Sequence, residues 1–200
     1  MVAETDRHEN LMEVVKGGTA REVQDACAEL AHAWKDAPVE SLLALKEQFH
    51  KLDIEDREAH LDSALITIAE KRPAPFTAIA TEPGHPLWRP TVEVLSLVGS
   101  SDYLDLFISL LPISPKKNIT DLLKAIGCYS CNKVVSAAGP YLGSDDERVF
   151  MEAVLTIKRC GGPDAIKLLR ESLADRRRKG SEMSTVLEAV LEEMREEVGG

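Results

Sequence analysis

Apolar residues recur along this chain with the spacing of α-helices. In REVQDACAELAHAW (residues 21–34) the apolar positions fall at i, i+3, i+4, i+7, i+8 and i+11, which is the stripe of an amphipathic helix. These positions are Val23, Ala26, Cys27, Leu30, Ala31 and Trp34. Thr19 lies just before this segment, and Glu22 lies three residues after Thr19, which is the pattern of a capping box. We therefore expect a helix to begin directly after Thr19.

Two further segments have the same period. Residues 39–52 and 57–72 each place four apolar side chains on one side, and Pro73 and Pro75 end the second segment. The side chains are Leu42, Leu45, Phe49 and Leu52 in the first, and Leu61, Ala64, Leu65 and Ile68 in the second. No stretch alternates polar and apolar residues for long enough to indicate a strand. The predicted fold class is all-α.

Three later stretches share an internal order of polar or proline-containing entry, apolar helix, small-residue turn and second apolar helix. They are residues 86–111, 114–142 and 145–173. Gly99, Gly127 and Gly161 mark the turns, and glycine suits the left-handed residue that ends a helix. Such a unit cannot bury its apolar face alone, so its repetition is typical of a stacked helical solenoid.

The endings LSLVG, LKAIG and LTIKRCG, each followed by a second helix such as DAIKLL, resemble HEAT repeats of the short bacterial kind over residues 86–175. The resemblance implies a right-handed α–α superhelix (a solenoid) of about five antiparallel helix pairs in one domain over residues 1–200. Earlier pairs are then expected at 20–51 and 57–82. Leu95, Leu123 and Leu155 are expected to be core residues of three successive first helices.

Both ends of the chain have the pattern of capping helices. Residues 181–198 place apolar side chains on one side and glutamates on the other, and a polar outer face keeps a terminal repeat soluble. The apolar set is Met183, Val186, Leu187, Val190, Leu191 and Met194. A helix around residues 11–15, ended by Gly17 and Gly18, is expected to serve the other end.

Composition and charge narrow the possible environments and partners. The chain has 200 residues and is 44% hydrophobic, enough for an ordinary core without disulfides. The cysteines follow no disulfide pattern and the first residues lack a signal-peptide core, so we expect a cytoplasmic protein. No apolar run approaches the ~18 residues of a membrane span, because Pro112 interrupts the longest. The formal charge of −10 argues against general nucleic-acid binding.

No catalytic motif is apparent. A phosphate-binding glycine loop, a His-Glu-x-x-His pair and a Gly-x-Ser-x-Gly turn are all absent from the sequence. His32, His50 and His60 lie on different predicted helices without partner spacing. We therefore expect neither catalytic residues nor a cofactor.

The thiols of AIGCYSCNKVV (residues 125–135) raise a separate question. Cys128 and Cys131 have the C-x-x-C spacing of zinc and redox sites, and Cys160 occupies the equivalent turn of the next repeat. A tetrahedral zinc site would need a fourth ligand, and no βαβ context for a thioredoxin-like motif is present. The favoured interpretation is a turn with ordinary thiols, with metal and redox roles left open.

Two charged features are candidates for binding a partner. Trp88 and Arg89 lie at a helix entrance between two prolines, where Trp88 either packs against the preceding repeat or is an exposed anchor. A basic island lies between two helices of an acidic chain, and it is either a solvated linker or a surface for an acidic protein patch. The island is Arg176, Arg177, Arg178 and Lys179, with Lys158 and Arg159 in the preceding turn.

Two functions are therefore considered. The first is a non-catalytic helical-repeat scaffold that binds a protein, and this is the one we favour. The second is an enzyme-associated protein, because some HEAT-like proteins resemble bilin lyases or DNA alkylation-repair glycosylases. A glycosylase needs a basic groove, which an acidic chain with one basic cluster does not favour.

The favoured interpretation of the thiols predicts that purified protein contains no stoichiometric zinc. Elemental analysis measures this directly. One zinc per chain that is lost in the Cys128→Ser variant would contradict it.

Overall fold

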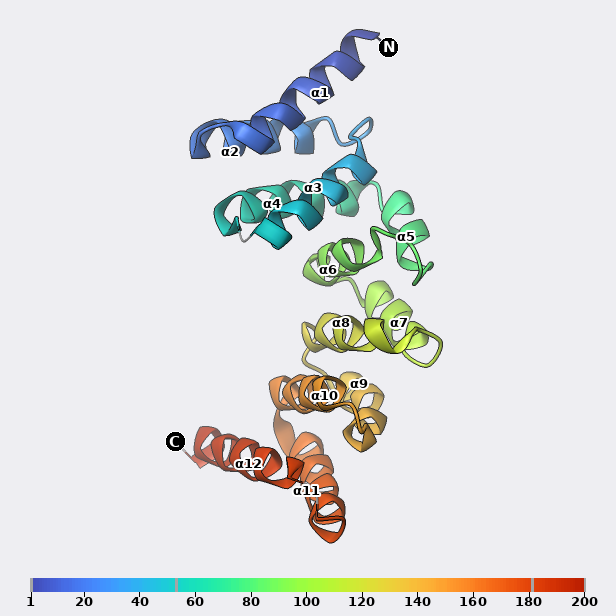
Figure 1. The fold of residues 1–200 in the computed structure, drawn as a ribbon, viewed down its shortest axis with the longest axis vertical. Coiled ribbons are helices and arrows are strands. Elements are labelled where there is room, and N and C mark those ends of the chain that lie inside the picture. Colours follow the sequence, from blue (N-terminus) through green and yellow to red (C-terminus); the bar gives the residue numbers. More distant parts are fainter. Residues whose placement is uncertain (1, 53, 181, 200) are drawn as a thin grey trace. The chain divides into compact units, whose positions relative to one another are not determined.

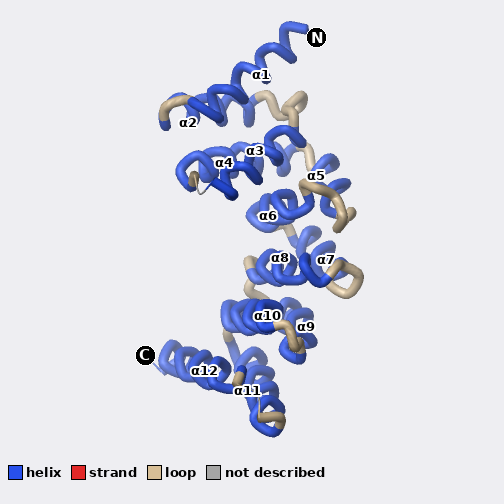
Figure 2. The backbone as a smooth tube through the Cα atoms, in the orientation of Figure 1, coloured by secondary structure: helices blue, strands red, loops and turns tan. Residues whose placement is uncertain are grey.

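The fold was analysed in a computed structural model that describes residues 2–52, 54–180 and 182–199 (Figure 1). Over these residues it has twelve α-helices, one short 3-10 helix and no strand, which confirms the all-α prediction (Figure 2). None of the described helices combines the length and the apolar character that crossing a membrane requires. The chain divides into two compact units, Met1–Ser100 and Ser101–Gly200. The prediction of one domain over residues 1–200 stays a prediction.

In the first unit, α2, α4 and α6 pack in succession, and α1, α3 and α5 each cover one of them. The helices are α1 (Val2–Gly17), α2 (Ala20–His32), α3 (Val39–Leu52), α4 (Glu55–Lys71), α5 (Ala74–Ala80) and α6 (Trp88–Val98). Helix α2 begins as expected, because the Thr19 side chain accepts from the Glu22 amide while the Glu22 side chain accepts from the Thr19 amide. The apolar stripes of the helices form the core between the two layers.

The second unit has the same two-layer order. Helices α8 and α10 pack side by side with α12 next to α10, and α7, α9 and α11 each cover one of them. The helices are α7 (Ser101–Leu110), α8 (Lys116–Gly127), α9 (Asn132–Ala138), α10 (Glu147–Cys160), α11 (Gly162–Arg178) and α12 (Met183–Gly199), with the 3-10 helix η1 (Gly139–Gly143) after α9.

The helices pair in a different phase from the expected repeats. Helix α7 packs mainly on α8, α9 on α10 and α11 on α12. The expected unit 114–142 instead joins α8 to α9, and 145–173 joins α10 to α11, which contact each other less extensively. The two helices of 86–111 belong to different units. The glycine-marked turns therefore lead from one helix pair to the next rather than joining the two helices of a pair.

The three turn glycines also have different reasons to be glycine. Gly99 ends α6 in the left-handed conformation, with φ +74° and ψ 14°, as expected. Gly161 follows α10 with φ +62° and ψ −164°, which is not the left-handed cap but is a conformation that glycine adopts far more readily than other residues. Gly127 does not have a positive φ, and the expectation of a left-handed cap there is wrong. It lies where α8 approaches α10: a Cβ at this position would be 3.1 Å from Arg159 Nη1 and 3.4 Å from Thr156 Oγ1.

Of the three expected core leucines, Leu95 and Leu123 are fully buried, but Leu155 is 37% exposed and its prediction is wrong. Leu95 and Leu123 each stand four residues before a turn glycine. The equivalent position before Gly161 is Ile157, which is fully buried. The apolar stripe of α10 runs through Ile157, and Leu155 lies off it.

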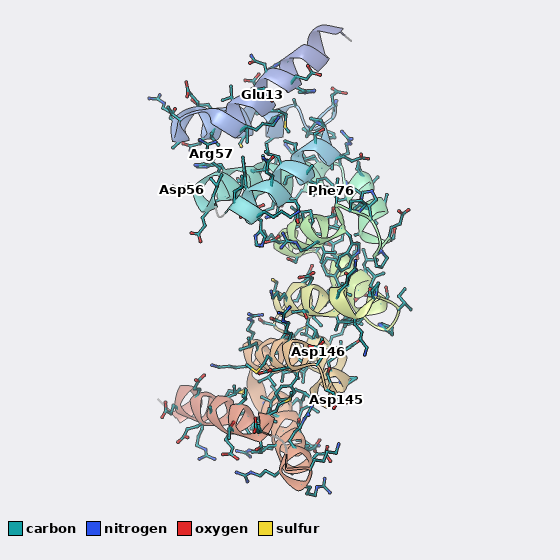
Figure 3. The ribbon with its side chains drawn as sticks, in the orientation of Figure 1. Glu13, Asp56, Arg57, Phe76, Asp145 and Asp146 are labelled. Carbon is teal, nitrogen blue, oxygen red and sulfur yellow. The ribbon has the colours of Figure 1, made fainter. Side chains whose placement is uncertain are left out.

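Arginine side chains hold helix ends that would otherwise leave carbonyl groups unpaired. Arg57 of α4 donates to the carbonyl oxygen of Lys16 and, at 3.0 Å, to that of Gly18, at the end of α1 (Figure 3). Arg72 donates at 2.5 Å to the carbonyl oxygen of Lys35 in the segment after α2. The last backbone carbonyl groups of a helix have no hydrogen-bond donor within that helix. These arginines donate the hydrogen bonds that water would otherwise supply, and they connect helices that are far apart in sequence.

We expect Leu123→Ala and Ile157→Ala each to destabilise the protein by about 2–5 kcal/mol, because each leaves a cavity in a packed core. Leu155→Ala is the matched control, expected to cost under about 1 kcal/mol because the side chain already contacts water. Urea unfolding followed by circular dichroism measures all three. A larger loss for Leu155→Ala than for Ile157→Ala would contradict the assigned face of α10.

Candidate functional site

The basic island lies in the last turn of α11 rather than in a linker, and its first member is not on the surface. Arg176 is only 8% exposed. Its Nη2 donates to the carbonyl oxygens of Leu142 at 2.8 Å and Ser144 at 2.7 Å, and its guanidinium lies 4.7 Å from the ring centroid of Phe150. The prediction of Arg176 as a partner-binding residue is corrected: its charge holds the end of η1 against α10.

The other three members of the island are exposed. Arg177 binds Glu188 of α12 through Nη2, at 2.8 Å. Lys179 and Arg178 lie 2.7 Å and 3.6 Å from the carboxylate of Asp175, and the hydrogen bond from Lys179 lowers the pKa of that carboxyl. Exposed pairs of this kind contribute little to stability, so breaking any one of them would cost little.

These cations continue a row that the sequence analysis missed. Lys167 and Arg170 are also exposed, and with Arg177 and Arg178 they fall at i, i+3, i+10 and i+11 on α11. Pro163, Ile166 and Ala174 lie on the same face. We call this face, from Pro163 to Lys179, the α11 stripe. The spacing of the basic residues was a signal that could have revealed it.

Shallow hollows lie on either side of Lys167. One, of about 600 Å³, is lined by Gly162, Pro163, Ile166, Lys167, Arg170 and Glu171. The other, of about 410 Å³, lies between α9 and α11 and includes Asn132, Pro140 and Leu168 among its lining residues. Both combine apolar walls with charged side chains, which suits the side chains of a polypeptide ligand.

Trp88 and Arg89 belong to the first unit, whereas the α11 stripe belongs to the second. Trp88 is 2% exposed, and its Nε1 donates at 2.9 Å to the carbonyl oxygen of Ala80 at the end of α5. An exposed anchor is therefore excluded for Trp88, because the side chain is used to pack α6 on α5. Arg89 is partly exposed and binds the Glu47 carboxylate of α3 at 2.7 Å.

Beside that pair lies a buried lysine that the sequence analysis did not identify. Lys46 is 1% exposed, and carboxylates of α4 and α6 surround its ammonium group. The distances from Nζ are 2.7 Å to Asp62 Oδ1, 3.0 Å to Glu58 Oε1 and 3.5 Å to Glu93 Oε2. In the sequence Lys46 stands four residues after Leu42 and three before Phe49, on the apolar side of α3. The presence of a charged residue on the apolar side of this helix was the sequence signal that could have identified Lys46 as buried.

The electrostatics of this cluster identify Lys46 as a structural cation. Burial acts to lower its pKa, but the hydrogen bond and charge of Asp62, the charge of Glu93 and the hydrogen bond to Glu58 outweigh burial and raise it. Burial also raises the pKa of Asp62, and the negative charges of Glu93 and Glu58 raise it further. The hydrogen bond and the charge of Lys46 oppose this rise without cancelling it. A lysine held protonated in this way ties α3, α4 and α6 together and is not an amine nucleophile.

The three candidate zinc ligands do not converge. Cys128 is exposed at the end of α8, whereas Cys131 begins α9 and Cys160 ends α10, both partly exposed. Among the described residues no three or more His, Cys, Asp or Glu side chains are grouped so that they could hold a metal ion. The prediction that the purified protein contains no stoichiometric zinc stays a prediction, to be tested by elemental analysis.

The histidines are distributed over the first unit. His32 and His60 line a hollow of about 380 Å³ between α2 and α4, together with Cys27, whose pKa is raised by burial to about 11. His50 Nδ1 lies 3.6 Å from Glu58 Oε1, at the edge of the Lys46 cluster. A thiol with so high a pKa is not a nucleophile at neutral pH.

Comparisons with known proteins do not assign a family. No protein-family model matches the sequence, and no curated protein matches it. A solved structure of an engineered protein from the Northeast Structural Genomics Consortium aligns with 95% of this chain and 97% of its own, at 14% identity and a TM-score of 0.48.

We expect Lys46→Met to destabilise the protein by about 3–5 kcal/mol at pH 7, because three carboxylates lose their shared cation. Without that cation the folded-state pKa of Asp62, which burial already raises, rises further above its unfolded value, so the folded protein binds more protons. Its stability then falls as pH rises, and the loss relative to the unmodified protein should be smaller at pH 5 than at pH 7.

Urea unfolding at both pH values provides the measurement. Lys51→Met is the matched control, since Lys51 is an exposed lysine of the same helix, 3.2 Å from Glu47, and should cost at most about 1 kcal/mol. A penalty for Lys46→Met that is the same at pH 5 and pH 7 would contradict the assigned electrostatics.

Proposed function

We propose that this chain is a helical-repeat protein-interaction module of the HEAT-like kind, and that the α11 stripe binds an acidic segment of a protein partner. The observation that supports this proposal most directly is a row of exposed cations on one helix of a chain whose formal charge is −10. The cations are Lys167, Arg170, Arg177 and Arg178. Arg177 and Arg178 also form ion pairs with Glu188 and Asp175, but like charges three residues apart on one helix face, as in Lys167 and Arg170, repel each other and do not stabilise the helix.

The repeat assignment is supported by the packing within each unit. In both units alternate helices pack in succession while the intervening helices cover them. Each pair thus buries its apolar stripe against the next, which is the principle of a helical solenoid. The right-handed superhelix and the capping roles of α1 and α12 are parts of this proposal.

The chemistry of the α11 stripe favours a polypeptide. Ile166, Pro163 and Ala174 alternate with the cations, and the adjoining hollow of about 600 Å³ is lined by both kinds of residue. An acidic amphipathic segment would place carboxylates on Lys167 and Arg170 and apolar side chains on Ile166. Mixed contacts of this kind give an interface both orientation and apolar burial.

Nucleic acid fits the same surface less well. Glu188 and Glu193 of α12 bind Arg177 and Lys158, so carboxylates already lie beside the cations of α10 and α11. A polyanion would bring a continuous line of phosphates towards this acidic helix, whereas a folded partner can place a few carboxylates selectively. An acidic protein segment is therefore the occupant we propose.

Binding of a fluorescein-labelled helical peptide rich in Glu and Leu, measured by fluorescence anisotropy, tests the proposal. We expect Lys167→Glu with Arg170→Glu to weaken binding about tenfold or more, because charge attraction is replaced by repulsion. Raising the salt concentration from low to physiological should also weaken binding to the unmodified protein.

The matched control is Arg21→Glu with Lys71→Glu, which makes the same change in net charge on exposed positions of α2 and α4. It should alter the affinity less than about twofold. Equal losses in the two double variants, no binding of the peptide to the unmodified protein, or tighter binding of duplex DNA than of the peptide would each contradict the proposal.

A further inference from the structure

A hollow of about 850 Å³ lies on the first unit, between α1 and the segment 36–41 that leads into α3. We call it the α1 hollow. Its carboxylates come from Glu9, Glu13 and Asp36, against one ammonium group from Lys16. Its lining therefore has a formal charge of −2 when the one histidine in it is neutral.

Most of these carboxylates are without partners. Glu9 and Asp36 are exposed, and no residue in the described part of the chain pairs with either. Glu13 lies 2.7 Å from Lys16 Nζ, but 71% of its side-chain surface is exposed (Figure 3). Glu9 and Glu13 stand four residues apart on α1, where like charges repel each other. The acidic wall of the hollow is therefore open to a cationic ligand.

The apolar groups of the α1 hollow also have counterparts on the α11 stripe. Met12 and Pro38 are part of the lining of the hollow. Pro163 and Ile166 line the hollow of about 600 Å³ beside the stripe. Both surfaces thus combine charged side chains with apolar ones, which is the composition of a protein interface.

The charged groups of the two surfaces match in sign and in spacing. Lys167 and Arg170 are three residues apart on α11, and Glu9 and Glu13 are four residues apart on α1. Residues three or four apart on a helix are neighbours, with about 5–6 Å between their Cβ atoms. Two ion pairs can therefore form side by side when α11 of one molecule lies on α1 of another.

The charge of the whole chain is divided in the same sense. Residues 1–100 contain 18 acidic and 10 basic side chains, whereas residues 101–179 contain 10 acidic and 13 basic ones, and the acidic α12 follows. Distant copies repel each other, because each has a formal charge of −10. At physiological salt this repulsion is screened beyond about 8 Å, while charges in direct contact are screened much less.

We propose that the acidic segment bound by the α11 stripe belongs to a second copy of this chain, whose α1 hollow receives Lys167 and Arg170. This rests on the function proposed above, in which the stripe binds an acidic protein segment. The stripe and the hollow are different surfaces, so the contact is heterologous. A dimer joined in this way keeps one free stripe and one free hollow, and further copies add head to tail into a ring or a filament.

Sedimentation velocity of the full chain at physiological salt measures this association. We expect an average mass that rises above the monomer mass of 22.0 kDa as the protein concentration increases. It should fall back at about 1 M salt, where the screening length is about 3 Å.

Two variants test the two surfaces separately. The stripe variant is Lys167→Glu with Arg170→Glu, and the hollow variant is Glu9→Gln with Glu13→Gln. Each should weaken self-association about tenfold or more, because the paired charges are lost or reversed. Arg21→Glu with Lys71→Glu is the control, and it should associate as the unmodified protein does. Circular dichroism checks that all variants stay folded.

A mixture of the two variants tests whether the contact is heterologous. The hollow variant keeps an intact stripe and the stripe variant keeps an intact hollow, so one molecule of each should form a dimer with the affinity of the unmodified contact. The other stripe and hollow of this dimer are both altered. The mixture should therefore stop at twice the monomer mass.

Three results would each overturn the proposal: a monomer at every concentration, full association in either variant, or a mixture that does not dimerise. The labelled peptide rich in Glu and Leu separates this from the proposed function. If the peptide binds the stripe while the chain stays monomeric, the stripe takes its acidic segment from another protein. If neither the peptide nor a second copy binds, both proposals are wrong.

Discussion

The structure depends on a single constraint: an amphipathic helix has one apolar stripe, and a pair of such helices still leaves part of that surface facing water. Successive pairs must therefore stack. The contact between α8 and α10 shows how closely they do so. Gly127 leaves room for Arg159 and Thr156, and the Thr156 hydroxyl satisfies a carbonyl of α8 across the contact. A side chain at Gly127 would have to displace the Arg159 guanidinium and would crowd the Thr156 hydroxyl that makes this contact.

Stacking also removes helix ends and charged groups from water. Long cationic side chains replace the hydrogen bonds to water that these groups lose. Arg57, Arg72 and Arg176 each donate to backbone carbonyls that lie 32–41 residues away in sequence. Lys46 does the same for carboxylates of α4 and α6. Burying an unpaired charge costs several kcal/mol, so moving their partners away would be costly for Lys46 and Arg176, which are almost completely buried. The apolar stripes supply the stabilisation, and the paired cations connect helices that are far apart in sequence.

The local sequence pattern was sufficient to predict the features that depend only on residues close together in the sequence. The apolar period predicted helix α2, the Thr19–Glu22 capping box predicted where it begins, and Leu95 and Leu123 were identified as core residues. The pairing of helices was not predictable in this way, because a glycine-marked turn looks the same within a pair and between pairs. Leu155 shows the consequence: its place in an approximate repeat alignment suggested burial, while the helical register of α10 buries Ile157.

The same limit explains why the basic island was misjudged as a unit. Four consecutive cations on a helix point in four directions, and only packing decides which of them faces the core. Arg176 faces η1 and Phe150 and is structural, whereas Arg177 and Arg178 face outward and align with Lys167 and Arg170, which lie about three and about two turns earlier on the same face. The acidic helix α12 then binds Arg177 through Glu188 and Lys158 through Glu193. Charge in this unit is therefore divided among Arg176, which fastens η1 against α10, Arg177 and Lys158, which α12 binds, and the exposed cations Lys167, Arg170 and Arg178, to which we assign the proposed partner.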